Sequence, residues 1–166
     1  MLTHPVLLST AAEIVGGALG LDVQYVTGQA RRFVRDGLLK PAQTVGGGVN
    51  RRAFLDSFGV ARLAVASIIQ KHGTHLGDQA AAVRQLDSVF DSREPGNHRF
   101  NFDSIVREFA QVEVDKNGDL PSDSPEWFFH WHVRFNGEYA GQCSREPVAN
   151  EVSHSIAIVS TRVALR

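Results

Sequence analysis

The chain has 166 residues, of which 43% are hydrophobic and 21% are charged, a composition typical of a globular protein with one domain or two small ones. The single cysteine, Cys143, excludes an internal disulfide framework and any all-cysteine metal site. The net charge of −1 hides an asymmetry, because residues 1–72 carry eight basic and four acidic side chains, a net +4, whereas residues 73–166 carry nine and fourteen, a net −5. Positive charge gathered in one half is typical of a module that binds a polyanion.

The sequence also indicates a location. No apolar run approaches the roughly 18 residues that cross a bilayer. The first residues lack the basic start and the apolar core of a secretory signal. We therefore expect a cytoplasmic protein with no membrane partner.

Two helices are predicted near the N-terminus. The first is expected to begin with a capping box at residues 10–13, in which Thr10 is the N-cap, and to end at Gly20. The second is expected to begin after Asp22, a good N-cap, and to end at Asp36-Gly37. A turn of about three residues between two helices is typical of a helix-turn-helix.

The second predicted helix is amphipathic. Its apolar stripe has helical spacing and consists of Val23, Val26, Ala30, Phe33 and Val34. The outward positions are polar or basic and consist of Gln24, Thr27, Gly28, Arg31, Arg32 and Arg35. Gly28 lowers helix propensity by about 1 kcal/mol, which indicates a close approach of the backbone to a neighbour.

A β-hairpin, or wing, is predicted next. Two short extended segments, 42–45 and 49–52, flank the triple glycine at 46–48. Arg51 and Arg52 are expected at the base of this hairpin, where they would contact phosphate or a minor groove.

Two further helices are predicted, over about 52–71 and about 78–90. In the first of them, Phe54 and Leu55 belong to the apolar side. Residues 91–98 are rich in turn-forming residues and lack an apolar pattern, which indicates a linker.

Beyond residue 98 the pattern changes to that of strands. A short helix capped by Asp103 is predicted first, followed by a strand around 112–114. Residues 127–135 alternate strictly between apolar and polar, which predicts a strand with one buried face. Asn136-Gly137 is the strongest hairpin signal in the chain, and a final strand is predicted over about 154–165.

The segment Phe33-Val34-Arg35-Asp36-Gly37-Leu38-Leu39-Lys40-Pro41 resembles the junction between recognition helix and wing in MerR-type regulators and related phage excisionases. Arg31-Arg32-Phe33 is similar to the basic and aromatic part of that helix. The glycine hairpin and its exit, Asn50-Arg51-Arg52, follow in the family's order. The resemblance covers about residues 9–71 and implies a winged helix-turn-helix that binds DNA.

An exposed basic helix face fits the major groove of DNA, where glutamine can read adenine and arginine can read guanine or hold a phosphate. Charge and resemblance together predict a sequence-specific, non-enzymatic regulator of transcription that binds double-stranded DNA and needs no cofactor. The predicted contacts are Gln24, Thr27, Gly28, Arg31, Arg32, Arg35, Lys40, Asn50, Arg51 and Arg52.

We therefore expect an α+β chain in three parts: a winged helix-turn-helix at 1–72, a helical connector at 73–98 and a small antiparallel-sheet domain at 99–166. The last is expected to mediate homodimerisation or to bind a protein partner, because a small sheet must bury its aromatic face. A DNA-binding protein of a phage or mobile element, acting in excision or packaging, is the first alternative.

An alternative from a different class is a small metal- or ligand-binding enzyme built on the C-terminal sheet. His130, His132 and His154 have the residue type of a zinc site, although alternating histidines also occur on the polar side of a strand. Cys143 lacks an activating motif, which indicates an inert thiol. Residues 115–119 have some features of a calcium loop, but their spacing departs from the EF-hand and favours a solvated turn.

Overall fold

The computed structural model describes residues 2, 4–48, 51–71, 80–81, 83–84, 86, 90–91, 99–100, 102–113, 115, 117, 121–122, 124, 127–133, 139–144 and 154–157. The chain divides into two compact units, residues 1–73 with 160–166 and residues 74–159. Helices and antiparallel sheets are both present, so the fold belongs to the mixed α+β class. No helix in the described ranges has the length and apolar character needed to cross a membrane.

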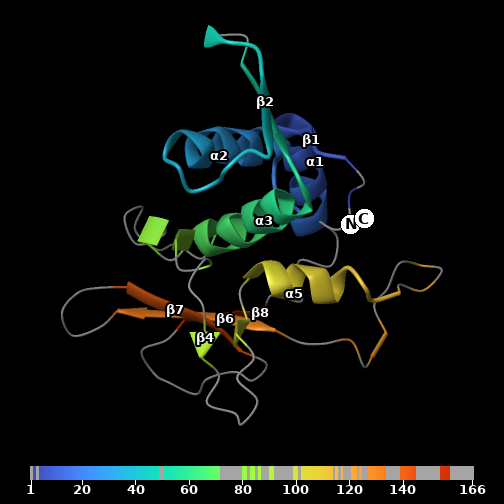
Figure 1. Cartoon of the computed structure of the whole chain (residues 1–166), viewed down its shortest axis with the longest axis vertical. Helices are drawn as coiled ribbons and strands as arrows, with labels where there is room; N and C mark the ends of the chain where they lie inside the picture. The colour runs from blue at the N-terminus through green and yellow to red at the C-terminus, as the bar shows by residue number, and fades with distance from the viewer. Residues whose placement is uncertain are drawn as a thin grey trace. The chain divides into compact units, whose positions relative to one another are not determined.

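In the first unit a small sheet accompanies three helices (Figure 1). The elements in chain order are β1 (Val6–Leu7), α1 (Leu8–Leu19), α2 (Val23–Arg35), β2 (Gln43–Val45), β3 (Arg52–Leu55) and α3 (Ser57–Lys71). The antiparallel sheet has the order β1-β3-β2, and Leu7 and Gln43 pair with Phe54 from its two sides. The β2–β3 hairpin projects away from the helices, and all three β2 residues are exposed.

α1 begins three residues earlier than the sequence predicts. Its N-cap is Leu7, which makes no side-chain capping hydrogen bond, and Thr10 lies inside the helix, so the predicted capping box is wrong. β1 runs directly into α1, and the pairing of β1 with β3 therefore determines where the helix starts. The predicted end is confirmed, since Gly20 is the C-cap.

The three-residue turn between α1 and α2 is confirmed. The carboxylate of Asp22 caps α2 by accepting a hydrogen bond from the backbone N–H of Tyr25 at 2.8 Å. Gly16 in α1 permits a close approach at this turn. A Cβ at that position would lie 3.1 Å from the carbonyl oxygen of Leu21 and 3.3 Å from Cγ2 of Val23. The placement of α2 against α1 thus depends on the absence of a side chain.

α2 buries most of the side that the sequence predicts. Val26, Ala30 and Phe33 are buried, but Val23 is 38% exposed, because it occupies the first position of the helix at the edge of the core. Gln29 is buried in addition, and its two amide atoms have no hydrogen-bond partner among the described residues.

The C-terminal end of α2 is defined by backbone hydrogen bonds, as Asp36-Gly37 predicts. The N–H of Leu38 donates to the carbonyl of Phe33 at 2.8 Å, and the N–H of Gly37 donates to that of Val34 at 3.2 Å. These are the two hydrogen bonds of a Schellman motif. Gly37 has a φ of 70°, a left-handed conformation that favours glycine.

The predicted hairpin is confirmed, but its second strand starts later than expected. Thr44 pairs with Ala53, and Val45 pairs with Arg52. Residues 46–51 therefore connect the two strands.

The helix predicted over 52–71 is wrong at its start. Phe54 and Leu55 belong to β3, and α3 begins only after Asp56, whose carboxylate accepts the N–H of Gly59 at 2.8 Å. A short apolar run fits a strand or a helix equally well, and here pairing with two neighbouring strands decides the outcome.

The second unit contains its own three-stranded antiparallel sheet, of order β7-β6-β8. Its elements are β4 (Phe90–Asp91), β5 (Arg99–Phe100), α5 (Phe102–Phe109), β6 (Phe128–Val133), β7 (Tyr139–Ser144) and β8 (His154–Ala157). Val133 pairs with Tyr139, so β6 and β7 form the predicted hairpin, although Asn136-Gly137 lies outside the described residues. β8 coincides with the start of the predicted final strand.

The structure describes the burial of two residues of the predicted apolar face at β6, and the side chains of its other members lie outside the described part. Trp127, just before the strand, and Phe129 are both buried. Nε1 of Trp127 donates a hydrogen bond of 2.9 Å to the carboxylate of Glu108 on α5. This bond joins α5 to the sheet.

Two details around α5 correct the prediction. Asp103 lies in the first turn of α5 and not before it. Residues 112–113 form no strand, because the N–H of Val112 donates to the carbonyl of Phe109 at 3.1 Å in a turn that follows the helix.

The stretch between α3 and β5 is described only in part. Residues 80–81 and 83–84 are helical, as predicted, and Val83 and Leu86 are buried. The predicted helix does not extend to Phe90, which pairs with Phe100. The first residue of the predicted linker, Asp91, belongs to β4, and the rest of that linker lies outside the described residues.

Candidate nucleic-acid interface

A groove of about 650 Å³ lies in the first unit between α2, the β2–β3 hairpin and the start of α1. Two of its arginines, Arg31 and Arg35, come from α2, and two others, Arg51 and Arg52, come from the hairpin. No acidic residue belongs to the described lining. The groove thus gathers positive charge from two segments that are far apart in the sequence.

The spacing of α2 directs its arginines into the groove. Thr27, Arg31 and Arg35 recur every four residues and so share one side of the helix, away from the buried stripe. The hydroxyl of Thr27 donates to the carbonyl of Val23 at 2.7 Å, which leaves its oxygen available as an acceptor. Gln24 lies on the same side one turn earlier and is exposed.

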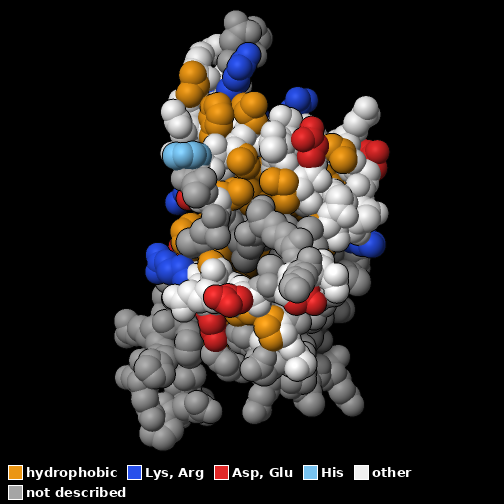
Figure 2. All heavy atoms as spheres, turned by 90° about the vertical axis from the view of Figure 1, so that its right-hand side faces the viewer, with side chains coloured by type: hydrophobic (Ala, Val, Ile, Leu, Met, Phe, Trp, Pro, Cys, Tyr) orange, Lys and Arg blue, Asp and Glu red, His pale blue; other side chains and the backbone are white. Residues whose placement is uncertain are grey.

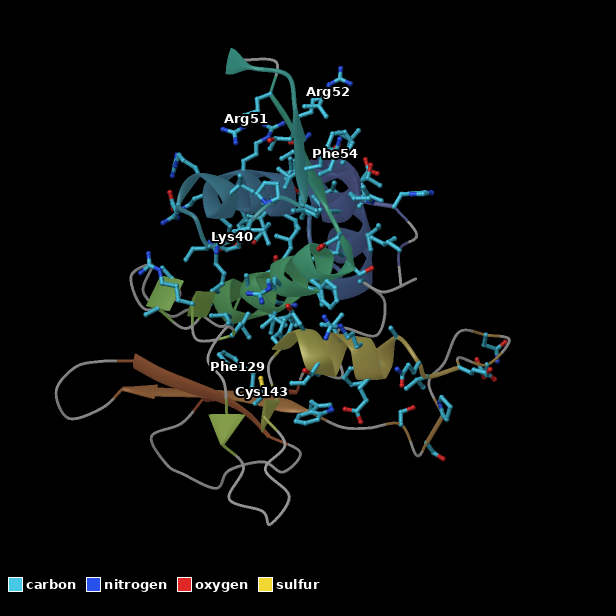
Figure 3. The ribbon with its side chains drawn as sticks, viewed as in Figure 1. Lys40, Arg51, Arg52, Phe54, Phe129 and Cys143 are labelled. Atoms are coloured by element: carbon cyan, nitrogen blue, oxygen red, sulfur yellow. The ribbon has the colours of Figure 1, made fainter. Side chains whose placement is uncertain are left out.

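Arg51 and Arg52 lie toward the distal end of the hairpin (Figure 3). Arg52 pairs with Val45, the last residue of β2, and the N–H of Arg51 donates to the carbonyl of Gly48 at 3.3 Å. The prediction that they lie at the base is wrong, because β3 starts at Arg52 and does not end there. Figure 2 shows Lys and Arg side chains at this projecting end of the molecule.

Three of the groove arginines have uncompensated charges. No carboxylate in the described part of the chain forms an ion pair with Arg31, Arg51 or Arg52, and all three are exposed. An anion entering the groove would therefore meet guanidinium groups that need not leave an existing partner.

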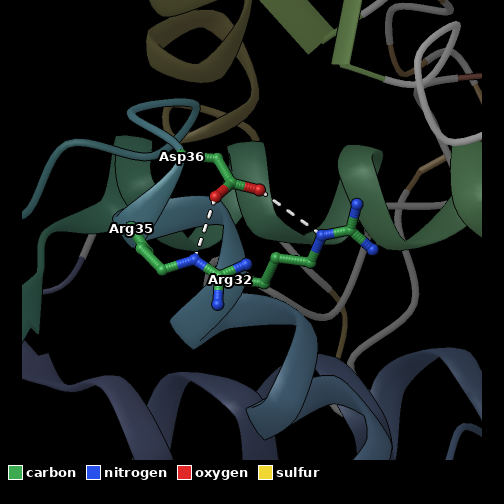
Figure 4. A network of polar contacts seen from close by, with 3 residues as sticks. All are labelled: Arg32, Arg35 and Asp36. Atoms are coloured by element: carbon green, nitrogen blue, oxygen red, sulfur yellow. Dashed lines mark hydrogen bonds and ion pairs between the residues drawn. The ribbon is translucent and has the colours of Figure 1, made fainter.

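The other two arginines of α2 share one carboxylate (Figure 4). Nε of Arg35 lies 3.1 Å from Oδ1 of Asp36, and Nε of Arg32 lies 3.4 Å from Oδ2. The hydrogen bond from Arg35, with a smaller contribution from Arg32, holds the pKa of Asp36 below its usual value, so this carboxyl group is ionised at neutral pH. Arg35 lines the groove, whereas Arg32 does not.

Gln24 and Gly28 are predicted contacts that lie on the exposed part of α2 outside the groove lining. A Cβ at Gly28 would meet no atom within 4 Å. The neighbour that the sequence led us to expect at Gly28 is therefore not found in the described part of this chain, and the helix surface there is open.

Two further predicted contacts, Lys40 and Asn50, are absent from the described lining of the groove. Lys40 is exposed, does not line the groove, and lies on the other side of α2 from Arg51 and Arg52 in the view of Figure 3. Asn50 lies outside the described residues.

The predicted contacts do not include six of the residues that line the groove, Leu7, Leu8, Ser9, Val34, Pro41 and Ala53, or the neighbouring Asp36. Ser9 lies in the first turn of α1 and lines the groove. It was not identified from the sequence because the helix was predicted to begin three residues later. Asp36 was read only as part of the helix end, although its spacing of four residues from Arg32 was a signal for an ion pair.

The described residues contain no group of three His, Cys, Asp or Glu side chains that could hold a metal ion. In the sheet register His154 pairs with Trp131, and not with His130 or His132, whose side chains lie outside the described part. The side chain of His154 lies outside the described part as well.

The other chemical candidates of the second unit also have simple structural explanations. Cys143 is buried, and burial raises the pKa of its thiol to about 12, so the thiol is protonated at neutral pH. The carboxylate of Asp115 accepts the backbone N–H of Asn117 at 2.9 Å, which is a local turn.

No protein family, curated protein or solved structure matches this chain. The groove and its charges are therefore the features from which a function can be inferred.

Proposed function

We propose that the first unit is a winged helix-turn-helix, with α2 as the recognition helix and the β2–β3 hairpin as the wing, and that the chain binds double-stranded DNA as a regulator of transcription. The observation that carries this proposal is the groove, which is lined by Arg31 and Arg35 from α2 and by Arg51 and Arg52 from the hairpin. Its described lining contains no acidic residue.

The lining of the groove matches the backbone of a nucleic acid. That backbone alternates charged phosphates with apolar sugars, and duplex DNA carries one negative charge per ~1.7 Å of its axis. The unpaired guanidinium groups suit the phosphates. The apolar side chains of Leu7 and Val34, which also line the groove, suit the sugars.

The exposed N-terminal part of α2 suits the base edges. The amide of Gln24 can form two hydrogen bonds with adenine in the major groove. Gly28, one turn later, leaves an open surface, so that the helix backbone can approach the bases closely. Gln24 would then select sequence, while the arginines of the groove supply most of the affinity.

The first test is whether the full-length protein selects a preferred duplex from a random-sequence library and binds it in a salt-dependent way. With three or four phosphates contacted, the logarithm of the binding constant should fall with the logarithm of salt concentration with a slope of about −3. Fluorescence anisotropy with a labelled duplex measures this slope. A double substitution, Arg31→Gln with Arg51→Gln, should reduce the slope by about 2.

Lys40→Gln is the matched control, because it removes a positive charge from the same unit but outside the groove. We expect it to change the slope by less than either groove arginine. Binding that does not respond to salt, or a double variant that binds like the wild type, would contradict the proposal.

A further inference from the structure

The contact between Asp36 and Arg35 leaves the two terminal nitrogens of the arginine side chain without a partner among the described residues. The carboxylate contacts Arg35 through Nε, and no other hydrogen bond or ion pair of the Arg35 side chain is found among the described residues. The two terminal nitrogens, which carry four of the five guanidinium N–H groups, are therefore available to a ligand. Arg35 also lines the groove, with its side chain 74% exposed.

Backbone hydrogen bonds fix the main chain at Asp36, and two arginines contact its carboxylate. The N–H of Asp36 donates to the carbonyl of Arg32 at 2.8 Å, and the Schellman motif follows directly. Leu39, three residues on, is buried and donates its N–H to the carbonyl of Phe33 at 3.1 Å. The second oxygen of Asp36 faces Arg32, so both oxygens are engaged.

We infer that Asp36 is a positioning residue: it holds Arg35 so that the terminal nitrogens of that arginine are presented to DNA in one orientation. The inference rests on the proposed function and deepens it by naming a residue that sets specificity without touching DNA. A long arginine side chain in solvent otherwise samples many rotamers, and its ordering opposes binding. A guanidinium group held in advance can form the two-bond contact with O6 and N7 of guanine.

Charge alone predicts a different effect of this carboxylate on DNA binding. A negative group beside the groove repels phosphate, so a variant without it should bind every duplex more tightly. Positioning instead predicts that the preference for one sequence falls when the carboxylate is removed. The two effects can be separated by measuring two duplexes.

The experiment compares the full-length wild type with Asp36→Asn on the duplex selected by the wild type and on a shuffled duplex of the same composition. We expect the ratio of the two affinities to fall at least about fivefold, since a good two-bond base contact contributes a discrimination of roughly 5- to 150-fold. Glu13→Gln is the control, because it removes one exposed negative charge from α1 that forms no ion pair in the described part of the chain. Its ratio should remain that of the wild type.

Arg35→Lys provides a second variant that keeps the charge but lacks the planar group with five donors. It should lower the same ratio, and it decides the question if thermal unfolding shows that Asp36→Asn is not folded. An unchanged or increased ratio in the folded variant overturns the inference. Wild-type protein that binds no duplex overturns the proposed function instead, so the two failures are distinct.

Discussion

Two glycines of the first unit differ in backbone conformation. Gly37 has a left-handed backbone, with a φ of 70°, at the point where α2 ends. Gly17 lies inside α1, where an added Cβ would meet nothing within 4 Å. Substitution by alanine should therefore change the free energy of unfolding in opposite directions at the two positions.

We predict that Gly37→Ala lowers the free energy of unfolding by about 1–2 kcal/mol, because an L-residue is disfavoured in that conformation. Gly17→Ala should raise it by about 0.5–1 kcal/mol, because alanine is the better helix former. Urea denaturation followed by circular dichroism measures both values. Equal effects at the two glycines would show that the backbone at Gly37 is not under this constraint.

At the scale of elements, β7 carries a buried thiol opposite a buried ring, since Cys143 pairs with Phe129 (Figure 3). Burial raises the pKa of this thiol from 9.0 to about 12. A group whose pKa is higher in the folded state favours folding only while it stays protonated.

We therefore predict that the contribution of Cys143 to stability is constant below pH 9 and decreases as the pH rises from 9 toward 12. The difference in free energy of unfolding between the wild type and Cys143→Ala, measured in urea at several pH values, isolates this effect from that of other groups. A difference that does not change with pH in that range would contradict the prediction.

The elements also show what a sequence can predict. The cap at Asp22 and the end at Gly37 were predictable, because their hydrogen bonds join residues at most five positions apart. The strand containing Leu55 was not, because it pairs with Val6, which lies far away in the chain. The groove was not predictable as a cavity either, since its lining comes from four separate segments, although four of its arginines were predicted contacts.

At the scale of the whole molecule, positive charge is concentrated in residues 1–72, with a net +4, and the rest of the chain is acidic, with a net −5. DNA phosphates attract the first half and repel the second, so the acidic half is expected to remain off the DNA. It is then available for contact with another protein chain.

We predict that two copies bind one duplex and that the selected site contains an inverted repeat. A single recognition helix contacts few base pairs, and paired copies with two-fold symmetry read two half-sites. Sedimentation velocity of the complex gives the number of chains per duplex. A one-to-one complex on a site without symmetry would show that the chain acts as a monomer, and long cooperative arrays would favour a role in excision or packaging.

Gly16 has a consequence for genetics. This residue belongs to α1 and is absent from the groove lining, yet even one methyl group there would press on the peptide that leads into α2. Alanine at this position would displace the start of α2 slightly without removing any side chain of the groove. Under the proposed function, a screen for mutants that lose DNA recognition should therefore recover changes at residue 16 in proteins that are folded, abundant and unaltered in charge.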